Sequence, residues 1–218
     1  MNFGKSFTFM FEDPHWSNKL IVPLLVGLIP IIGPMVQNGY LQRTIKNVAA
    51  HESFPLPELD FGHDLEKGFR FFLISLLYAL PWVLISLLLS WPASTLDRTP
   101  RGPMTNVAVI LIAVFVVLGF IIVAMLLPMV LANVAVKETF AAGFAFKDFS
   151  HMLQNNPVPW LFALLGMVIS VIISPLGLVF FVVGGLVTGF YGQLMAAHLS
   201  GQAYNLSQTL NGVDTVAY

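Results

Sequence analysis

The 218-residue chain contains no cysteine, and only 10% of its residues are charged. The absence of cysteine excludes disulfides, thiolate metal sites and cysteine nucleophiles. The charged fraction lies far below the quarter or so that is usual in soluble globular domains. A net charge of −1 gives no general attraction to nucleic acid, so no nucleic-acid partner is expected.

Apolar residues take the place of the missing charges. They make up 57% of the chain, and the mean hydropathy is +0.82. No Lys, Arg, Asp or Glu occurs between Phe71 and Leu96, between Met104 and Val136, or between Phe149 and Val213. A membrane-spanning helix needs about 20 such residues, so the first two gaps hold one span each and the third holds two. The predicted spans are residues 71–91, 107–136, 159–174 and 178–199.

An earlier apolar stretch, residues 20–42, is broken at its centre by Pro30, Gly33 and Pro34. Each proline removes a backbone donor and disfavours helix at the residue before it. Two interpretations stay open: one kinked span, or a re-entrant hairpin of two half-helices that returns to its side of entry. Asn38 is expected to cap the broken backbone around Gly33, because bare backbone at membrane depth must be covered.

The distribution of positive charge favours the re-entrant hairpin. With a re-entrant hairpin, the Lys and Arg residues divide eight to two between the sides of the membrane, and with a kinked span they divide six to four. The positive-inside rule prefers the more uneven division and places both termini in the cytoplasm. The eight are Lys5, Lys19, Arg43, Lys46, Lys67, Arg70, Lys137 and Lys147, against Arg98 and Arg101.

The remaining segments are predicted to lie at the membrane surface. Residues 1–19 form an aromatic-rich interfacial segment, and residues 43–70 form a polar loop and an amphipathic helix with Asp60 as its N-cap. Residues 139–153 form a second interfacial helix, and residues 200–218 a polar tail. The chain is therefore predicted to be one all-α integral membrane domain, residues 1–218. It has a broken re-entrant hairpin, four transmembrane helices and two interfacial amphipathic helices.

Three glycines recur along one side of the last predicted span: Gly185, Gly189 and Gly192. Small residues at this spacing let helix backbones approach closely in lipid. They are predicted to form a helix-packing interface.

A polar stretch contains five of the chain's eleven acidic residues together with two histidines. Asp60, His63 and Asp64 are spaced to share a helical face and bind a cation, but a solvated acidic loop is the favoured interpretation. No catalytic residue, metal ligand or cofactor-binding residue is predicted, and phosphate-binding loops and His-Glu-x-x-His motifs are missing. The full set is His51, Glu52, Glu58, Asp60, His63, Asp64 and Glu66.

The predicted spans contain no carboxylate, Lys or Arg at depth. Ion-coupled transport and intramembrane acid–base or metal chemistry rely on such groups. The chain is therefore predicted not to be an enzyme, and secondary active transport is disfavoured.

Several strings resemble one family across nearly the whole chain. They are Glu12-Asp13-Pro14-His15-Trp16, Leu28-Ile29-Pro30-Ile31-Ile32-Gly33-Pro34, Gly39-Tyr40, Pro55-Leu56-Pro57-Glu58 before Asp60, Leu77-Tyr78-Ala79-Leu80-Pro81, Asn156-Pro157 and Gly201-Gln202-Ala203-Tyr204. The ordered set is similar to the domain of unknown function 4013 family of bacterial and archaeal membrane proteins. It departs from that pattern at Leu59, where the family's usual residue is Trp. The resemblance implies a multi-pass protein of the prokaryotic cell (plasma) membrane, the inner membrane where there are two, and brings no activity or ligand.

The predicted function is that of a non-enzymatic accessory or scaffold subunit of a larger membrane protein complex. Its expected partners are the lipid bilayer and other membrane protein subunits, or further copies of itself. The alternative is a passive channel or transporter for a small or lipid-like solute, built around the broken hairpin.

Overall fold

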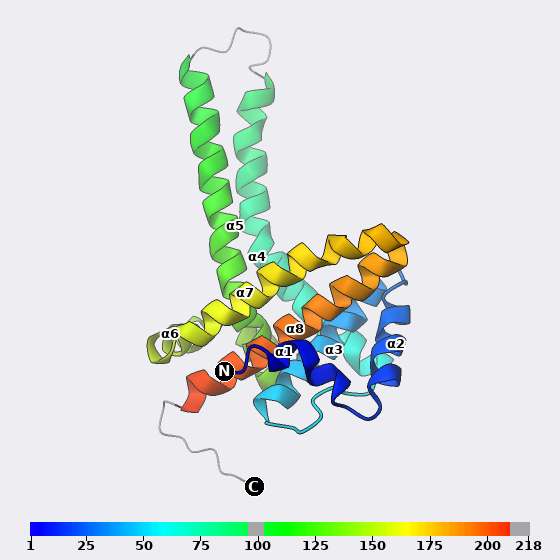
Figure 1. Ribbon diagram of the computed structural model, residues 1–218. Coiled ribbons are helices and arrows are strands. Elements are labelled where there is room, and N and C mark those ends of the chain that lie inside the picture. The colour runs from blue at the N-terminus through cyan, green and yellow to red at the C-terminus, as the bar shows by residue number, and fades with distance from the viewer. Residues whose placement is uncertain (96–102, 210–218) are drawn as a thin grey trace. The chain divides into compact units, whose positions relative to one another are not determined.

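The computed structural model describes residues 1–95 and 103–209, and within these ranges every regular element is helical. Figure 1 shows the elements in chain order from blue to red. They are α1 (Lys5–Thr8), η1 (Phe9–Phe11), α2 (Trp16–Val26), α3 (Ile32–Ala49), α4 (Phe61–Thr95), α5 (Pro103–Lys137), η3 (Phe140–Phe144), α6 (Phe146–Asn155), α7 (Val158–Ile173), η4 (Ser174–Phe180) and α8 (Phe181–Thr209).

The chain forms two compact units. The larger unit comprises Met1–Phe72 and Pro128–Tyr218, and the smaller unit comprises Leu73–Leu127. The chain leaves the larger unit within α4 and returns to it within α5.

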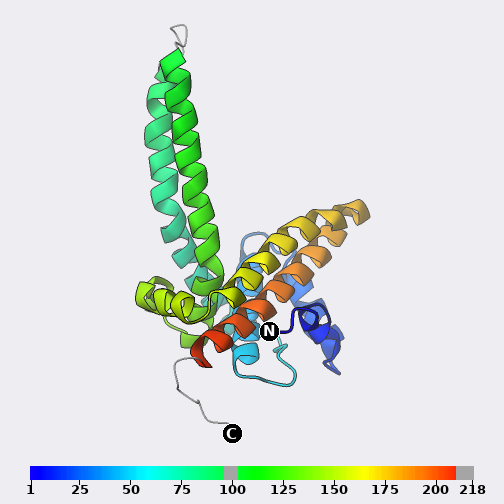
Figure 2. The same cartoon turned by 60° about the vertical axis from the view of Figure 1, so that its left-hand side comes forward.

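The larger unit is built around α8. The 3-10 helix η4 turns the chain back so that α7 and α8 run side by side, as both views show (Figures 1 and 2). On another side, α3 packs against α8 and contributes the buried side chains of Tyr40 and Ile45. From α8, Leu194, Met195 and Leu199 are fully buried. These apolar contacts form the core of the unit.

The N-terminal segment packs on α8, and much of it is not free for the membrane surface. Phe9 is 2% exposed and Met10 is fully buried. The Tyr191 hydroxyl donates to the carbonyl of Phe7 over 3.0 Å, and Asn2 N donates to Gln202 Oε1 over 2.7 Å. Trp16, at the start of α2, is 41% exposed.

The stretch from α2 to α3 is a helical hairpin. The Tyr40 hydroxyl donates to the carbonyl of Lys19 over 2.9 Å, and Gln37 Nε2 donates to the carbonyl of Pro23 over 3.0 Å. Moving forward along α3, from Gln37 to Tyr40, the partner moves backward along α2, from Pro23 to Lys19, so the two helices are antiparallel.

The smaller unit consists of the neighbouring portions of α4 and α5. The rings of Trp82 and Phe115 lie 5.7 Å apart between centroids, and the Trp82 ring occupies the space that a side chain at Gly119 would need. Most other apolar side chains described in this unit face outward, among them Leu87 at 59% and Leu111 at 63% exposed.

Three helical stretches in the described residues are long and apolar enough to cross a membrane: Phe61–Leu88, Ile110–Lys137 and Val158–Gly177. They overlap the first two predicted spans, residues 71–91 and 107–136, and contain the third, residues 159–174. The fourth, residues 178–199, is not among them in this part of the chain. His198 and Ser200, near the end of this segment and just after it, are buried.

Three expected boundaries are wrong. The first is the end of the helix that holds the first predicted span, residues 71–91, because α4 continues through Pro92 to Thr95. Membrane-spanning helices tolerate proline where neighbouring groups satisfy the backbone. The tail expected from residue 200 is helical to Thr209, where Tyr204 and Ser207 are buried. The second interfacial helix is split into η3 and α6, with Ala145 between them.

Candidate functional site

The break in the hairpin lies at Gly27–Ile31, slightly before the position expected from the prolines. α2 ends at Val26, and α3 begins at Ile32, so Gly33 and Pro34 belong to its first turn. Gly33 is buried against the backbone of Val26 and Gly27, where a Cβ would overlap the Val26 carbonyl. Glycine at this position therefore allows the tight return of the chain.

The backbone of the break is satisfied by the chain itself. The amides of Gly27, Leu28, Ile29, Ile32 and Gly33 all donate to carbonyls between residues 23 and 30, over 2.7–3.2 Å. The turn thus presents few bare backbone donors, while its apolar side chains point outward.

Asn38 and its neighbour Gln37 divide the expected capping role. Asn38 Nδ2 donates to the carbonyl of Pro34 on its own helix over 2.9 Å. Gln37, 8% exposed and not singled out from the sequence, makes the cross-hairpin bond to Pro23. Pro30 is exposed, and its carbonyl accepts from the amide of Ile32.

Helices α3 and α4 cross where both carry glycine. A Cβ on Gly39 would overlap the carbonyl of Asp64, and a Cβ on Gly68 would overlap the carbonyl of Met35. The backbones therefore touch at this crossing, which brings the polar side chains of both helices into reach of one another. No periodicity in the sequence marked this pair, because the two glycines lie on different helices.

The crossing places a buried ion pair between α3 and α4. Arg43 donates from Nε and Nη2 to the two carboxylate oxygens of Asp64, each over 2.6 Å, and Asp64 is 0% exposed. Two parallel bonds of this kind are the strong form of the Arg–carboxylate pair. Asp64 belongs to the stretch that was expected to be a solvated acidic loop, and for this residue that expectation is wrong.

The same carboxylate helps to start α4. Asp64 Oδ2 accepts from the amide of Asp60 over 3.0 Å, while Asp60 Oδ1 accepts from the amide of His63 over 3.1 Å. This reciprocal arrangement satisfies amides that the first helical turn leaves open. The predicted N-cap role of Asp60 is confirmed. The cation-binding arrangement of these three residues is not formed, because Asp64 is occupied by Arg43.

A second cluster surrounds Glu138, the residue that follows α5. Its carboxylate pairs with Lys46 of α3, at 3.0 Å, and with Lys67 of α4, and its carbonyl accepts from Arg70. The hydrogen bond from Lys67 is the main cause that lowers the pKa of Glu138 from 4.5 to about 2; Lys46 adds to it. Glu138 has a positive φ of 54°, an uncommon conformation outside glycine.

A third ion pair joins α5 to α6. Lys137 Nζ lies 2.6 Å from Asp148 Oδ2, and this hydrogen bond holds the pKa of Asp148 below its usual range. Asn133 supports the pair by donating from Nδ2 to Asp148 Oδ2 over 3.3 Å, and the same Nδ2 donates to the carbonyl of Ala142 over 2.8 Å. The charges of the larger unit thus connect helices. The lowered pKa values of Glu138 and Asp148 keep these two carboxylates ionised at neutral pH, which suits them to hold helix ends together.

The glycines of α8 meet α7 or the η4 turn of the same chain. A Cβ on Gly192 would lie 2.7 Å from Ser170 Oγ, and a Cβ on Gly189 would lie 2.9 Å from Ser174 Oγ. Gly185 is half-buried. At Gly189 and Gly192 this face is therefore filled by the chain's own α7–η4 segment.

The remaining residues of the acidic stretch are scattered. Glu66 pairs with Arg70 at 2.8 Å, His51 contacts Asn205 on α8, and Glu52, Glu58 and His63 are exposed at the surface. Within residues 1–95 and 103–209, no three His, Asp or Glu side chains are placed to hold a metal ion together.

Comparison with known proteins gives one match. The family model described as "Protein of unknown function (DUF4013)" matches residues 22–191, which is most of the chain. No curated protein and no solved structure matches. The matched range begins within α2, includes the turn of the hairpin, α3, the ion-pair clusters and α7, and ends within α8.

Proposed function

The chain belongs to the DUF4013 family of proteins of unknown function, and we propose that it serves as an accessory or scaffold subunit of a larger membrane protein complex. It is a membrane protein with three helices able to span a bilayer. One observation carries the proposal. Only 6% of the apolar 18-residue stretch of α4, and of that of α5, is buried in the protein, against 28% of the corresponding stretch of α7.

The smaller unit supports a role in protein contacts because its described residues present apolar surface and no charged side chain. Its described residues, 73–95 and 103–127, contain no ionised side chain. Outward-facing side chains such as Ile110 and Leu118 are 60% and 53% exposed, so the described part of the chain leaves more than half of their surface uncovered. In a bilayer such faces contact either lipid or the helices of other proteins. Contact with the helices of other proteins is the role that we propose.

We further propose that the α2–α3 hairpin is re-entrant. Its tip carries Leu28, Ile29 and Ile31, which are 53%, 41% and 75% exposed. Apolar side chains outside, with amides bonded locally, suit a turn that dips into hydrocarbon. The same local bonding leaves few backbone groups for a solute, so it favours a scaffold over a channel through the break.

This placement puts both termini in the cytoplasm of a prokaryotic cell, with the chain in its plasma membrane. All eight Lys and Arg residues assigned to the cytoplasmic side belong to the larger unit. The two opposing residues, Arg98 and Arg101, lie outside the described residues. The positive-inside rule supports this orientation.

Single cysteines test the hairpin, since the chain has none to remove. Asn18→Cys and Ser53→Cys replace exposed residues before and after the hairpin, and Ile31→Cys replaces the most exposed residue of its tip. With an impermeant thiol reagent, positions 18 and 53 should label only from the cytoplasmic side, and position 31 only after the membrane is dissolved and the protein denatured. Labelling of positions 18 and 53 from opposite sides would show that the hairpin crosses the membrane.

Co-purification tests the scaffold. The tagged full chain is extracted from native membranes in mild detergent, and whatever remains in a fixed ratio is identified by mass spectrometry. A second membrane protein, or further copies of the chain, should be recovered in that ratio, and a tagged membrane protein of similar size serves as the control. Recovery of a lone monomer across several mild detergents contradicts the proposal.

A further inference from the structure

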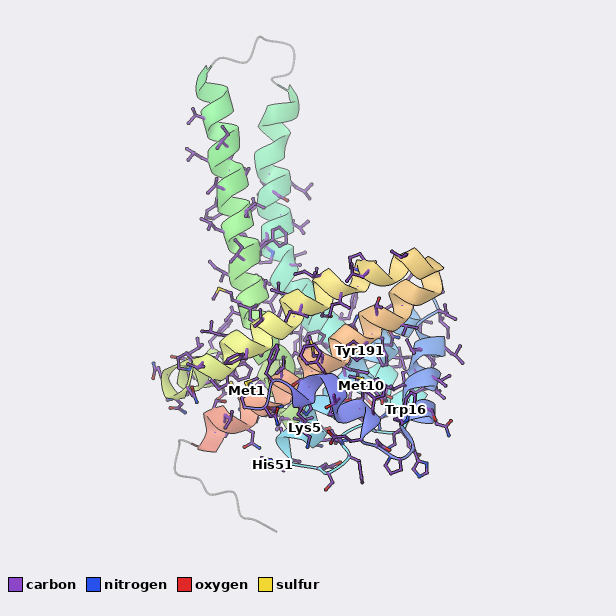
Figure 3. The ribbon with its side chains drawn as sticks, viewed as in Figure 1. Met1, Lys5, Met10, Trp16, His51 and Tyr191 are labelled. Atoms are coloured by element: carbon purple, nitrogen blue, oxygen red, sulfur yellow. The ribbon has the colours of Figure 1, made fainter. Side chains whose placement is uncertain are left out.

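A cavity of about 570 Å³ opens between three segments of the larger unit: residues 1–12, residues 48–55 and residues 198–206 of α8. Figure 3 shows the labelled Met1, Lys5 and His51 close together beside it. Sites for small molecules have volumes of roughly 300–1,000 Å³ and are mostly apolar with a few placed polar groups. Phe9, Val48 and Pro55 supply apolar surface here.

The cavity wall contains a histidine whose hydrogen position follows from its partners. Gln202 Oε1 accepts from the amide of Asn2, which sets the orientation of the Gln202 side chain. Its Nε2 then donates to His198 Nδ1 over 2.9 Å, and the Ser6 hydroxyl lies 2.8 Å from the same nitrogen. Because an amide NH₂ group only donates, Nδ1 is the acceptor, and the neutral ring carries its hydrogen on Nε2.

His198 therefore keeps one donor for a molecule in the cavity. Its side chain is 4% exposed and stacks on Phe9, with 4.3 Å between ring centroids. Nε2 has no hydrogen-bond partner within the described ranges of the chain, and it is not among their fully enclosed, unsatisfied atoms. His198 lines the cavity, and because Nδ1 is bonded to Ser6 and Gln202, Nε2–H is the ring's one remaining donor.

The rim of the cavity carries both signs of charge. Lys5 Nζ lies 3.7 Å from Glu12 Oε2, and both side chains are about half exposed, so the pair is loose. Glu52, on the loop after α3, lines the same cavity; it is exposed and has no ion-pair partner in residues 1–95 and 103–209. A simple anion would meet two carboxylates, and a simple cation would leave the His198 donor without an acceptor.

We propose that this cavity binds a small zwitterion with a primary ammonium group and an oxyanion. Glu52 and Glu12 receive the ammonium group, Lys5 and His198 Nε2–H receive the oxyanion, and Phe9 covers the carbon atoms between them. A free amino-alkyl phosphate or amino acid has this chemistry, and so does an ethanolamine phospholipid headgroup. This site is separate from the apolar faces of α4 and α5 and does not depend on the scaffold role.

Calorimetry on the full chain in lipid-free detergent tests the charge requirement. The probes are phosphoethanolamine, ethanolamine and inorganic phosphate. Phosphoethanolamine should bind roughly tenfold or more tightly than either fragment, because each fragment leaves charged or donor groups of the site unpaired. Equal affinity for phosphoethanolamine and ethanolamine overturns the proposal.

Matched variants locate the site. Glu52→Gln should weaken phosphoethanolamine binding by roughly fivefold to tenfold. Glu58→Gln is the control, because Glu58 lies on the same loop but lines a different hollow with His15 and Lys19. Equal weakening by both variants overturns the assignment.

A second experiment, with lipid, distinguishes a free soluble ligand from a phospholipid headgroup. The protein is released from bilayers of mixed ethanolamine and glycerol phospholipids and examined by native mass spectrometry. The proposal is supported, and the ligand is identified as lipid, if the protein retains ethanolamine lipid but does not bind the soluble probe. In that case Glu52→Gln should reduce the retention of the lipid and Glu58→Gln should not. If neither the soluble probe nor the lipid is held in a Glu52-dependent way, the proposal is wrong.

Discussion

Replacing Asp64 by Asn should destabilise the larger unit strongly, although it changes few atoms. Asp64 is 0% exposed and receives two bonds from Arg43 and one from the amide of Asp60. Breaking a buried ion pair by removing one partner costs about 3–5 kcal/mol. Arg43 keeps 18% exposure and a bond to the carbonyl of Glu58, so we expect the lower end, about 3 kcal/mol.

For a chain of this length, about 3 kcal/mol corresponds to a fall in Tm of roughly 6–12 °C. Thermal unfolding in detergent can be followed by the fluorescence of Trp160, which is 3% exposed within the same unit. The matched control is Glu66→Gln, two residues away on α4, whose pair with Arg70 is exposed and should contribute less than about 1 kcal/mol.

The double variant tests whether Arg43 is the cause. Arg43→Met combined with Asp64→Asn should destabilise less than the sum of the two single changes, because each change alone already breaks the pair. Equal and small shifts in Tm for Asp64→Asn and Glu66→Gln would refute the buried-pair argument. Stabilisation of the native chain by a divalent cation, lost in Asp64→Asn, would instead favour the metal site.

Three further outcomes follow from the same contacts. Gly68→Ala should lower Tm by several degrees, because its Cβ would overlap the α3 backbone. Gly62→Ala on the same helix should leave Tm unchanged or raise it, because its Cβ would make only an ordinary contact with Asp60 Oδ1, at 3.9 Å. The pKa of Glu138 is lower in the folded state than in the unfolded one, so its stabilisation is complete above about pH 5 and is lost as the pH falls toward 2. Acid titration of Glu138→Gln should accordingly show a weaker loss of stability over that range. Gln37→Leu, which breaks the cross-hairpin bond, should destabilise the protein more than Asn38→Leu, measured by unfolding in the same detergent.

The local parts of the fold were accessible from the sequence because they depend on neighbouring residues. The apolar runs predicted helices that match the three membrane-competent stretches, and the Asp60 side chain predicted the start of α4. Pro30 and Gly33 predicted a break within a few residues of its observed place. Helix capping and proline chemistry act over one or two turns, so a short window of sequence contains the needed information.

Hydropathy misled where a polar residue is buried or an apolar residue touches protein. Asp64 was assigned to water because it lies among other acids, yet Arg43, twenty-one positions earlier, encloses it. Phe9 was assigned to the membrane surface because it is aromatic, yet it stacks on His198. A hydropathy pattern indicates whether a side chain favours water or an apolar environment. It does not indicate which distant residue the side chain contacts in the folded protein.

The amino-acid sequence alone predicted a helical membrane protein, the approximate location of its long apolar helices, and a break near Pro30 and Gly33. Three contacts became visible only in the folded chain. Gly39 and Gly68 face one another, and Glu138 forms ion pairs with Lys46 of α3 and Lys67 of α4. The N-terminal segment lines a cavity together with α8. The physical reason is distance along the chain. Helix formation is a local property of the backbone, whereas these contacts join residues tens to nearly two hundred positions apart and exist only once the helices have packed.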